Sequence, residues 1–423
     1  MVRPMIQTTQ ALRDATVDAD HDVRPAPARP RSEPATRGRA DVSFSIHEDL
    51  SAVERDWRAF ERTADCTVFQ SFDWLSAWQR HVGAPQDVRP AIAIVRDGSG
   101  AMLMLLPLMA VPGGLVRRLT FLGSDLCDYN APLLASGFAS RVGPDDFAAL
   151  WHGIAAELQS QPRLRHDVVC FDKMPERVGE QDNPMLTLRA GLNPNGAYWT
   201  PLTGDWETFY ADKRSSSTRR RDRTKRKRLG DLGEVRFVNP QGGAELSASF
   251  ETLIEQKSRS LIRMGADDVF ARPGYRAFFR DIATAPATRE MAHLSRLDVG
   301  GECAAANLGL IFRGRYYHVI ASHGDGEAAK FGPGVAHLHD LMRYAIERKC
   351  DTFDFTIGDE RYKSEWCDGV FRLYDHVSAA TWRGMPAAAA ISAERGIKRL
   401  IKQTPALWNA ASRVREWLGV LRG

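Results

Sequence analysis

The spacing of hydrophobic residues divides most of the chain into short elements. Residues 44–62 and 71–82 have helical spacing, and in the second segment Phe72, Leu75 and Trp78 share one face. Residues 88–111 predict two strands joined by a turn at Asp97-Gly98. The other elements predicted before residue 205 are a strand within 115–123, a helix within 147–160 and a strand within 167–174.

A similar plan returns in the second half of the chain. Residues 291–325 predict a strand, a glycine turn at Gly300-Gly301, a second strand, a turn at Arg313-Gly314 and a third strand. This arrangement lies about 200 residues after the first turn, which indicates an internal duplication. We therefore predict an α/β (α+β) fold of two domains, each a mixed, largely antiparallel sheet flanked by helices.

Composition gives the expected boundaries of these domains. Residues 1–40 contain five prolines and seven arginines with few large apolar side chains, so we expect a disordered tail. We place the first domain at 41–204 and the second at 205–383. Residues 384–423 predict basic amphipathic helices, which either lie on an anionic membrane or pack on the protein itself. Their apolar stripe is Leu407, Ala411, Val414, Leu418 and Leu421, beside Trp408 and Trp417.

Several classes of protein are disfavoured by composition. The longest apolar run, 101–111, is too short to cross a bilayer, and the N-terminus has no apolar signal-peptide core. We expect a cytoplasmic protein, peripheral to a membrane if the C-terminal helices bind one. The six cysteines form no C-x-x-C pair. We expect no metal, since His337 and His339 would lie about 200° apart on a helix.

Positive charge is concentrated in one segment. The chain has a net charge of +4, but residues 213–228 hold ten Lys or Arg and one Asp, so they carry +9 and the remainder carries −5. We predict a linking helix over 213–229 that ends at Leu229-Gly230. Its charge fits a solvated helix face, or a surface that binds the phosphates of CoA, an anionic glycan or lipid, or tRNA.

The sequence KFGPGVAHL, residues 330–338, places two glycines and a proline between a predicted strand and a predicted helix. Such a turn exposes the first amides of the helix and lets an anion approach the backbone. A turn without a ligand would have the same sequence. Residues 324–329 also fit G-x-G-x-x-A, but Gly332-Pro333-Gly334 would interrupt the helix that a dinucleotide site needs.

Several segments together resemble a known family. They include LDVGGECAAANLGL, ASHGD, FGPGVAHL and FDFTIGDERYKSEW, and in the earlier part VFQSFDWLSAW, FLGSDLCDYNAPLL and EQKSRS. From about Phe44 to Trp382 the chain resembles GNAT-fold N-acyltransferases of the CelD/BcsL-like group, relatives of FemABX-type aminoacyl transferases. The resemblance implies two GNAT-like domains, with acyl-CoA (acetyl-CoA) as co-substrate held by Phe331, Gly332, Gly334 and Val335.

The chemistry implied is direct attack of an amine or hydroxyl on an acyl carbonyl, which needs positioning and a proton acceptor rather than a covalent nucleophile. By position in the matching segments, we expect Glu360 and Asp354 as proton acceptors, with Tyr362 and Lys363 donating to the leaving group or binding an anionic substrate. Asp354 would serve equally as a structural acid. The residues expected to contact the acceptor are Asp128, Tyr129, Lys257, His323 and Asp325.

The predicted function is transfer of an acyl group to a sugar, polysaccharide or cell-envelope precursor. Two alternatives stay open: an aminoacyl-tRNA-dependent transferase, and a noncatalytic accessory protein of exopolysaccharide biosynthesis. The partner expected is a small molecule or glycan; nucleic acid is expected only if tRNA is the donor.

Overall fold

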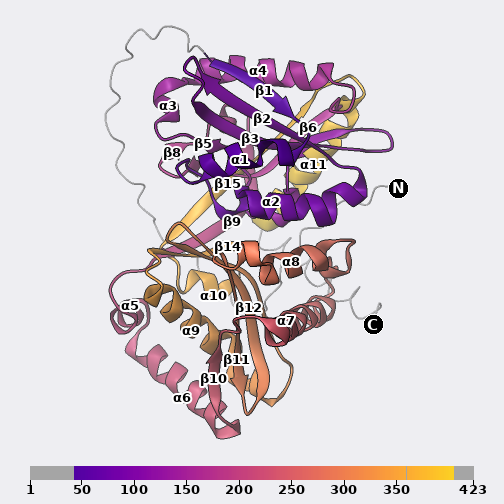
Figure 1. Cartoon of the computed structure of the whole chain (residues 1–423). Helices are drawn as coiled ribbons and strands as arrows, with labels where there is room; N and C mark the ends of the chain where they lie inside the picture. The colour runs from indigo at the N-terminus through magenta and orange to yellow at the C-terminus, as the bar shows by residue number, and fades with distance from the viewer. Residues whose placement is uncertain (1–41, 359, 404–423) are drawn as a thin grey trace.

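The computed structural model describes residues 42–358 and 360–403. Within these ranges one sheet of 13 strands runs through the molecule from top to bottom (Figure 1). The strand order is β1-β2-β3-β4-β6-β15-β9-β14-β13-β12-β11-β10, with β5 paired to β3. The predicted tail, 1–40, and the end of the predicted C-terminal helices, 404–423, lie outside the described residues.

The first half contains a meander of strands with helices between them. Its strands are β1 (Val42–His47), β2 (Arg89–Asp97), β3 (Met102–Val111), β4 (Arg118–Phe121), β5 (Leu133–Leu134) and β6 (Val168–Pro175), followed by the small hairpin β7 (Arg177–Val178) and β8 (Gln181–Asp182). Its helices are α1 (Leu50–Glu61), α2 (Phe72–Trp78), α3 (Phe138–Arg141) and α4 (Pro144–Ser160).

The second half repeats this order after strand β9 (Gly191–Pro201). Its strands are β10 (Val235–Val238), β11 (Ala292–Val299), β12 (Glu302–Phe312), β13 (Arg315–His323), β14 (Thr352–Ile357) and β15 (Gly369–Ala379). Its helices are α5 (Trp206–Lys213), α6 (Ser216–Leu232), α7 (Gly243–Arg263), α8 (Tyr275–Thr284), α9 (Pro333–Glu347) and α10 (Arg361–Ser364), and α11 (Gly384–Gln403) follows β15.

The duplication is visible in the strand order. In each half an antiparallel meander ends in one parallel pair, β4 with β6 and β13 with β14. In each half, two helices lie between the first and second strands of the meander. They are α1 and α2 in the first half and α7 and α8 in the second. The molecule is thus a mixed α/β structure with a large, mostly antiparallel sheet flanked by helices, as the hydrophobic pattern predicted.

The two halves exchange their last strands. Strand β9 leaves the first half and pairs with β14 of the second, while β15 returns from the second half and pairs with β6 of the first. Strands β9 and β15 also pair with each other, which makes the sheet continuous. The predicted boundary between residues 204 and 205 is therefore crossed by the sheet in both directions.

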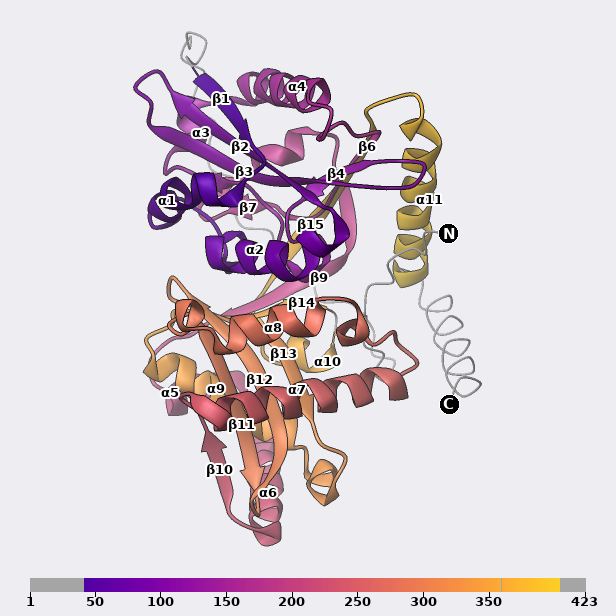
Figure 2. The same cartoon turned by 45° about the vertical axis from the view of Figure 1, so that its right-hand side comes forward.

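Helices cover both faces of the second half. Helix α7 packs on strands β11, β12 and β13, and α9 packs on the same strands. The two helices lie on opposite faces, with α7 and α8 nearest the viewer in Figure 2. The sheet therefore forms a layer between them, and its strand ends lie between the halves of the molecule.

Two local predictions were wrong. Residues 44–62 are not one helix, because Val42–His47 form the edge strand β1 and a helix begins only at Leu50. Asp49 sets that start by accepting a hydrogen bond from Ser51 N at 2.8 Å. The basic helix was predicted over 213–229, but it begins at Ser216, since Lys213 ends α5, and it passes Gly230 to end at Leu232. Its C-cap is Gly233, where an added Cβ would lie 2.4 Å from the Cα of Gly300.

Candidate functional site

The site begins where two parallel strands separate. Strands β13 and β14 pair over only three positions, of which Tyr317 with Asp354 is the last. Strand β13 continues to His323, whereas β14 turns at Thr356, which has a φ of 59°. A threonine in this left-handed region is strained, since its branched side chain crowds the backbone. The strain marks the point at which β14 bends away from its neighbour.

Helix α9 starts just beyond β13, at the predicted glycine turn. Gly332 has a φ of 68° and no side chain caps the helix. The carbonyl of Gly332 accepts hydrogen bonds from Val335 N at 3.1 Å and Ala336 N at 3.3 Å. Val335 N is thus engaged within the turn. Among the described residues no hydrogen bond is formed by Gly334 N, so this amide is open to a ligand.

The basic helix α6 lies beside this turn. Its N-terminus is capped by Ser215, whose Oγ accepts a hydrogen bond from Thr218 N at 3.2 Å. The ammonium of Lys225 lies 3.8 Å from the position that a Cβ would take at Gly332. The guanidinium of Arg228 lies 5.8 Å from the centre of the Phe331 ring. The charge-rich segment and the glycine turn, which were predicted separately, therefore form one region.

Between α6 and the turn is a cavity of about 440 Å³. Its lining repeats on one helical face of α6, at intervals of three and four residues. The lining residues are Ser217, Arg220, Arg221, Thr224, Lys225 and Arg228 of α6, together with Lys330 and Phe331. We call this the α6 cavity. It contains five cationic side chains and no carboxylate.

The basic residues on the two sides of α6 differ in whether they form ion pairs. Toward the body of the protein, Arg226 forms an ion pair with Asp340 at 2.9 Å, and Arg214, just before the helix, pairs with Glu365 at 2.7 Å. In contrast, the five cationic side chains of the α6 cavity form no ion pair with any described residue. Uncompensated positive charge around a hollow favours a ligand with several negative charges.

A second group of polar residues is buried between the two halves, centred on Asp354. Asp354 Oδ1 accepts hydrogen bonds from Tyr129 Oη at 2.7 Å and Thr356 N at 2.8 Å. Its Oδ2 forms an ion pair with Arg315 at 2.9 Å. Both oxygens of this fully buried carboxylate are therefore occupied, and Tyr129 links the first half of the chain to the second.

The ammonium of Lys363 lies in the same region and is almost completely buried. It forms an ion pair with Glu360 at 2.8 Å and donates to the carbonyl of Ile357 at 3.0 Å. This places a positive charge at the end of β14, where the strand diverges from β13. Tyr362 packs its ring 6.1 Å from Phe355, and burial raises the pKa of Tyr362 well above its usual value.

Electrostatic effects connect further residues to this group. Burial lowers the pKa of Lys257 to about 8, with Glu360 opposing the shift and Lys363 adding to it. Burial raises the pKa of Asp128, and the charge of Lys173, a hydrogen bond from Thr356 and the charge of Lys363 oppose that shift. Burial, followed by the charges of Lys363 and Lys257, lowers the pKa of His318 to about 3.

The structure thus gathers six of the nine predicted catalytic and acceptor-contacting residues into one largely buried group. We call the following set the interface cluster: Asp128, Tyr129, Lys257, His318, Asp354, Thr356, Glu360 and Lys363. Arg315, Thr356 and Lys173 were not among the predictions. Arg315 and Lys173 carry no signal in the sequence, because their importance comes from pairing across the chain.

Two predicted residues have other surroundings. Asp325 forms an ion pair with Arg263 at the end of α7, at 3.2 Å. His323 is exposed, with its Nδ1 3.1 Å from the carbonyl of Gly324 and its ring 3.9 Å from a Cβ position at Gly334. His323 therefore borders the glycine turn rather than the interface cluster.

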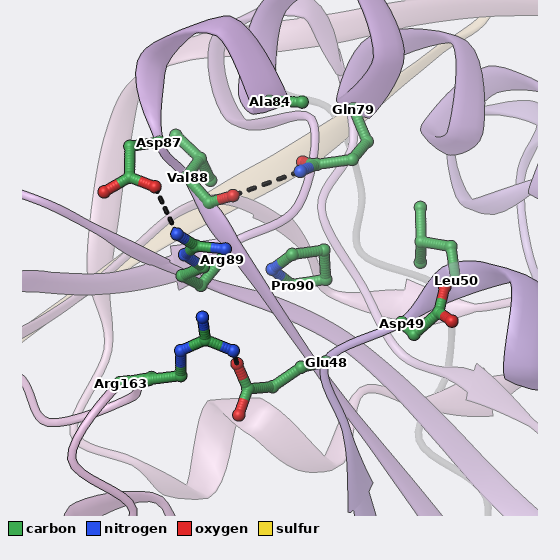
Figure 3. Close-up of a pocket in the computed structure, with 10 residues that line it drawn as sticks. All are labelled: Glu48, Asp49, Leu50, Gln79, Ala84, Asp87, Val88, Arg89, Pro90 and Arg163. Atoms are coloured by element: carbon green, nitrogen blue, oxygen red, sulfur yellow. Dashed lines mark hydrogen bonds and ion pairs between the residues drawn. The ribbon is translucent and has the colours of Figure 1, made fainter.

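A separate cavity of about 370 Å³ lies in the first half, near the start of α1 (Figure 3). Its two arginines pair with carboxylates, Arg163 with Glu48 at 3.8 Å and Arg89 with Asp87 at 2.5 Å. The lining also contains Asp49, so carboxylates outnumber cations and this cavity does not favour an anion. Among the described residues, no group of three or more His, Cys, Asp or Glu could hold a metal ion.

A known protein family matches the part of the chain that contains the α6 cavity. Residues 216–364 match the family model described as an acetyltransferase (GNAT) domain. The match begins at the first residue of α6 and ends at the last residue of α10, so it includes the α6 cavity and most of the interface cluster. The chain therefore contains a GNAT-fold acetyltransferase domain. A search of curated proteins found no match to the sequence.

Solved structures resemble most of the chain. A crystal structure of FemX is 11% identical, with a TM-score of 0.56, and the alignment covers 82% of this chain and 99% of that one. L-PGS from Bacillus licheniformis is 12% identical, with a TM-score of 0.47 and coverage of 84% and 98%. A tandem GNAT protein from the clavulanic acid pathway is 14% identical, with a TM-score of 0.44 and coverage of 80% and 99%. At these identities the likeness to FemX concerns the fold alone.

Proposed function

We propose that the protein is an acyltransferase that moves an acyl group from acyl-CoA to an amine or hydroxyl of a sugar, polysaccharide or cell-envelope precursor. The observation that carries this proposal is the α6 cavity at the start of α9. Five cations without an ion pair to a described residue and the open amide of Gly334 suit the several phosphates of CoA. The CelD/BcsL-like assignment and the identity of the acceptor are part of the proposal.

The residues around the divergent strands fit the remainder of the donor. An extended pantetheine arm could run from the α6 cavity along the end of β13, since β13 and β14 pair no further than Tyr317 and Asp354. The acyl carbonyl would then lie near the interface cluster. Burial there strengthens the electrostatic effect of each charged group on the reacting atoms.

In the proposed reaction the acceptor nitrogen or oxygen attacks the acyl carbonyl, the new bond forms, and the carbon–sulfur bond breaks to release CoA as its thiol. Lys363, as a buried ammonium, would stabilise the charge that develops on the carbonyl oxygen or on the departing sulfur. Glu360 and Asp128 are the carboxylates available to take the acceptor proton. Asp354, with both oxygens engaged, would position the cluster rather than accept a proton.

A second donor is supported by one observation. Arg223 and Lys227 also carry charge on α6 without an ion pair to a described residue, and they lie outside the lining of the α6 cavity. A basic surface wider than the cavity suits the backbone of a charged tRNA. Competition between acetyl-CoA and aminoacylated tRNA for the protein separates the two donors.

Release of free thiol from acetyl-CoA in the presence of a panel of amino sugars and hydroxyl acceptors tests the proposal. We expect thiol release that depends on the acceptor, and about a hundredfold loss in Glu360→Gln or Asp128→Asn if that residue takes the proton. Glu347→Gln, an exposed change at the end of α9, is the matched control. If acetyl-CoA binds but no acceptor causes thiol release, the catalytic proposal is rejected and a binding role is left.

A further inference from the structure

Helix α11 turns its uncharged residues toward solvent and its charged residues toward the side that packs on the protein. Its ionic residues between Glu394 and Arg399 lie on the other, half-buried side, where Glu394 and Lys398 pair with each other at 2.6 Å and keep side chains that are 41% and 44% exposed. The exposed side spans an arc of about 160° and has no charged residue. The residues of this exposed side are Met385, Pro386, Ala389, Ala390, Ser392, Ala393, Gly396, Ile397 and Leu400.

The two arginines of α11 are tied to the first half of the sheet. Arg395 donates to Cys170 Sγ at 3.1 Å and to the carbonyl of His376 at 3.4 Å. Arg399 donates to the carbonyl of Leu192 at 2.5 Å. These bonds fix the rotation of the helix on β15, β9 and β6. A helix on the surface of a protein ordinarily turns its charged side outward, so the uncharged outer side of α11 is unusual for a surface in contact with water alone.

A second exposed apolar group lies beside the start of α11. The loop between β3 and β4 carries Leu115, which is 94% exposed, and the segment before α11 carries Trp382, which is 77% exposed. Asp167 joins the two segments, because Asp167 Oδ2 accepts from Arg117 N at 3.0 Å and Oδ1 accepts from Thr381 Oγ1 at 2.7 Å. Figure 2 shows this loop reaching toward the upper end of α11.

Positive charge surrounds these apolar residues. The guanidinium of Arg383 lies 5.6 Å from the centre of the Trp382 ring. The exposed Arg117 donates to the carbonyl of Pro162 and adds a second positive charge beside Leu115. Tryptophan and arginine next to exposed aliphatic side chains are the combination that suits the headgroup region of an anionic bilayer.

We propose that the exposed side of α11, together with Leu115 and Trp382, binds the surface of a membrane that contains anionic lipids. Met385, Ile397 and Leu400, each more than half exposed, would enter the boundary between headgroups and acyl chains. Arg117 and Arg383 would contact the phosphates. This contact needs only the surface of the bilayer. No helix within the described residues is long and apolar enough to cross a membrane.

This inference is separate from the proposed acyl transfer, since none of its residues lines the α6 cavity or belongs to the interface cluster. Co-sedimentation of the full chain with vesicles tests it. We expect binding to vesicles of phosphatidylcholine mixed with phosphatidylglycerol, and much weaker binding to phosphatidylcholine alone or at high salt.

Variants identify the surface that binds. Ile397→Asp should reduce the bound fraction about tenfold, because a carboxylate would enter the lipid boundary. Ile262→Asp, the same change at a 64% exposed position of α7, should leave binding unchanged. Equal melting temperatures of the variants would show that both are folded.

Four results would overturn the proposal. The first is a wild-type chain that does not bind the anionic vesicles. The second is equal binding by wild type and Ile397→Asp. The third is loss of binding in Leu418→Asp but not in Ile397→Asp, which would assign the contact to the end of the chain. The fourth is a wild-type dimer that Ile397→Asp dissociates, which would show that a second copy of the chain covers this surface.

Discussion

At the scale of single residues, Asp354 and Tyr129 show how a predicted site residue can have a structural task. Tyr129 donates to Asp354 from the other half of the molecule, and Arg315 neutralises the same carboxylate. The sequence predicted both Asp354 and Tyr129 from their segments. It could not predict Thr356, because a φ of 59° in a threonine has no signature in composition or spacing.

We predict that Asp354→Asn lowers the free energy of unfolding by about 2 kcal/mol, because the neutral amide leaves Arg315 without its charged partner. Urea denaturation measures this change. Tyr129→Phe, which removes a single hydrogen bond, should cost about 1 kcal/mol. If the Asp354→Asn variant kept its stability and lost thiol release, the positioning role would be contradicted and Asp354 would be assigned to the chemistry.

Lys257 predicts a dependence of stability on pH. Its pKa is about 8 in the folded protein, below the usual value of 10.5 that applies when the chain is unfolded. Between these two values the unfolded chain binds the additional proton, so this residue makes the protein more stable as pH rises from 8 to 10.5. Below pH 8 its buried charge opposes folding.

The variant Lys257→Met should therefore be more stable than wild type at pH 7, and the difference should decrease as pH rises toward about 10. Urea midpoints of both proteins at about pH 7, 8.5 and 10 measure it. Lys349→Met, at an exposed lysine, should show no such trend. A difference between Lys257→Met and wild type that stays constant with pH would show that Lys257 keeps an ordinary pKa.

At the scale of secondary-structure elements, an element could be predicted from the sequence when the residues that determine it lie close together in the chain. Helix α9 follows from Gly332, Pro333 and an apolar face, all within a few residues of one another. Phe44 and Ile46 alternate with polar residues as in an edge strand, but strand β1 was missed because the helical spacing that begins near Leu50 was extended back over them. Its pairing partner β2 begins more than 40 residues later, so no local signal marks the pairing.

Helix α6 was predicted as a linking helix, and in the structure it also lines the α6 cavity. Its charge could be counted in the sequence, but the division into a paired side and a side that lines the α6 cavity depends on Asp340, which pairs with Arg226 from more than 100 residues away. The family match that begins at Ser216 places this helix within the acetyltransferase domain.

At the scale of the whole molecule, the sequence predicted two similar halves but not their exchange of strands. Turn residues and alternating apolar positions indicated the meanders. The choice of β9 and β15 to pair across the halves depends on contacts more than 150 residues apart along the chain, for which a single sequence has no local signal.

The exchange predicts cooperative unfolding. Neither half can complete its part of the sheet without a strand from the other, so we expect calorimetry to give one transition with equal calorimetric and van't Hoff enthalpies. Two separated transitions would show that the halves fold independently and that the exchanged strands add little to stability.

The central claim is that the α6 cavity and the glycine turn bind the phosphates of CoA, and calorimetric titration with acetyl-CoA tests it most directly. Wild type should bind, Lys225→Glu should lose at least about tenfold in affinity, and Arg223→Glu, the same charge change two residues away and outside the cavity lining, should bind like wild type. Absence of binding by wild type, or equal affinities for Lys225→Glu and Arg223→Glu, would contradict the claim.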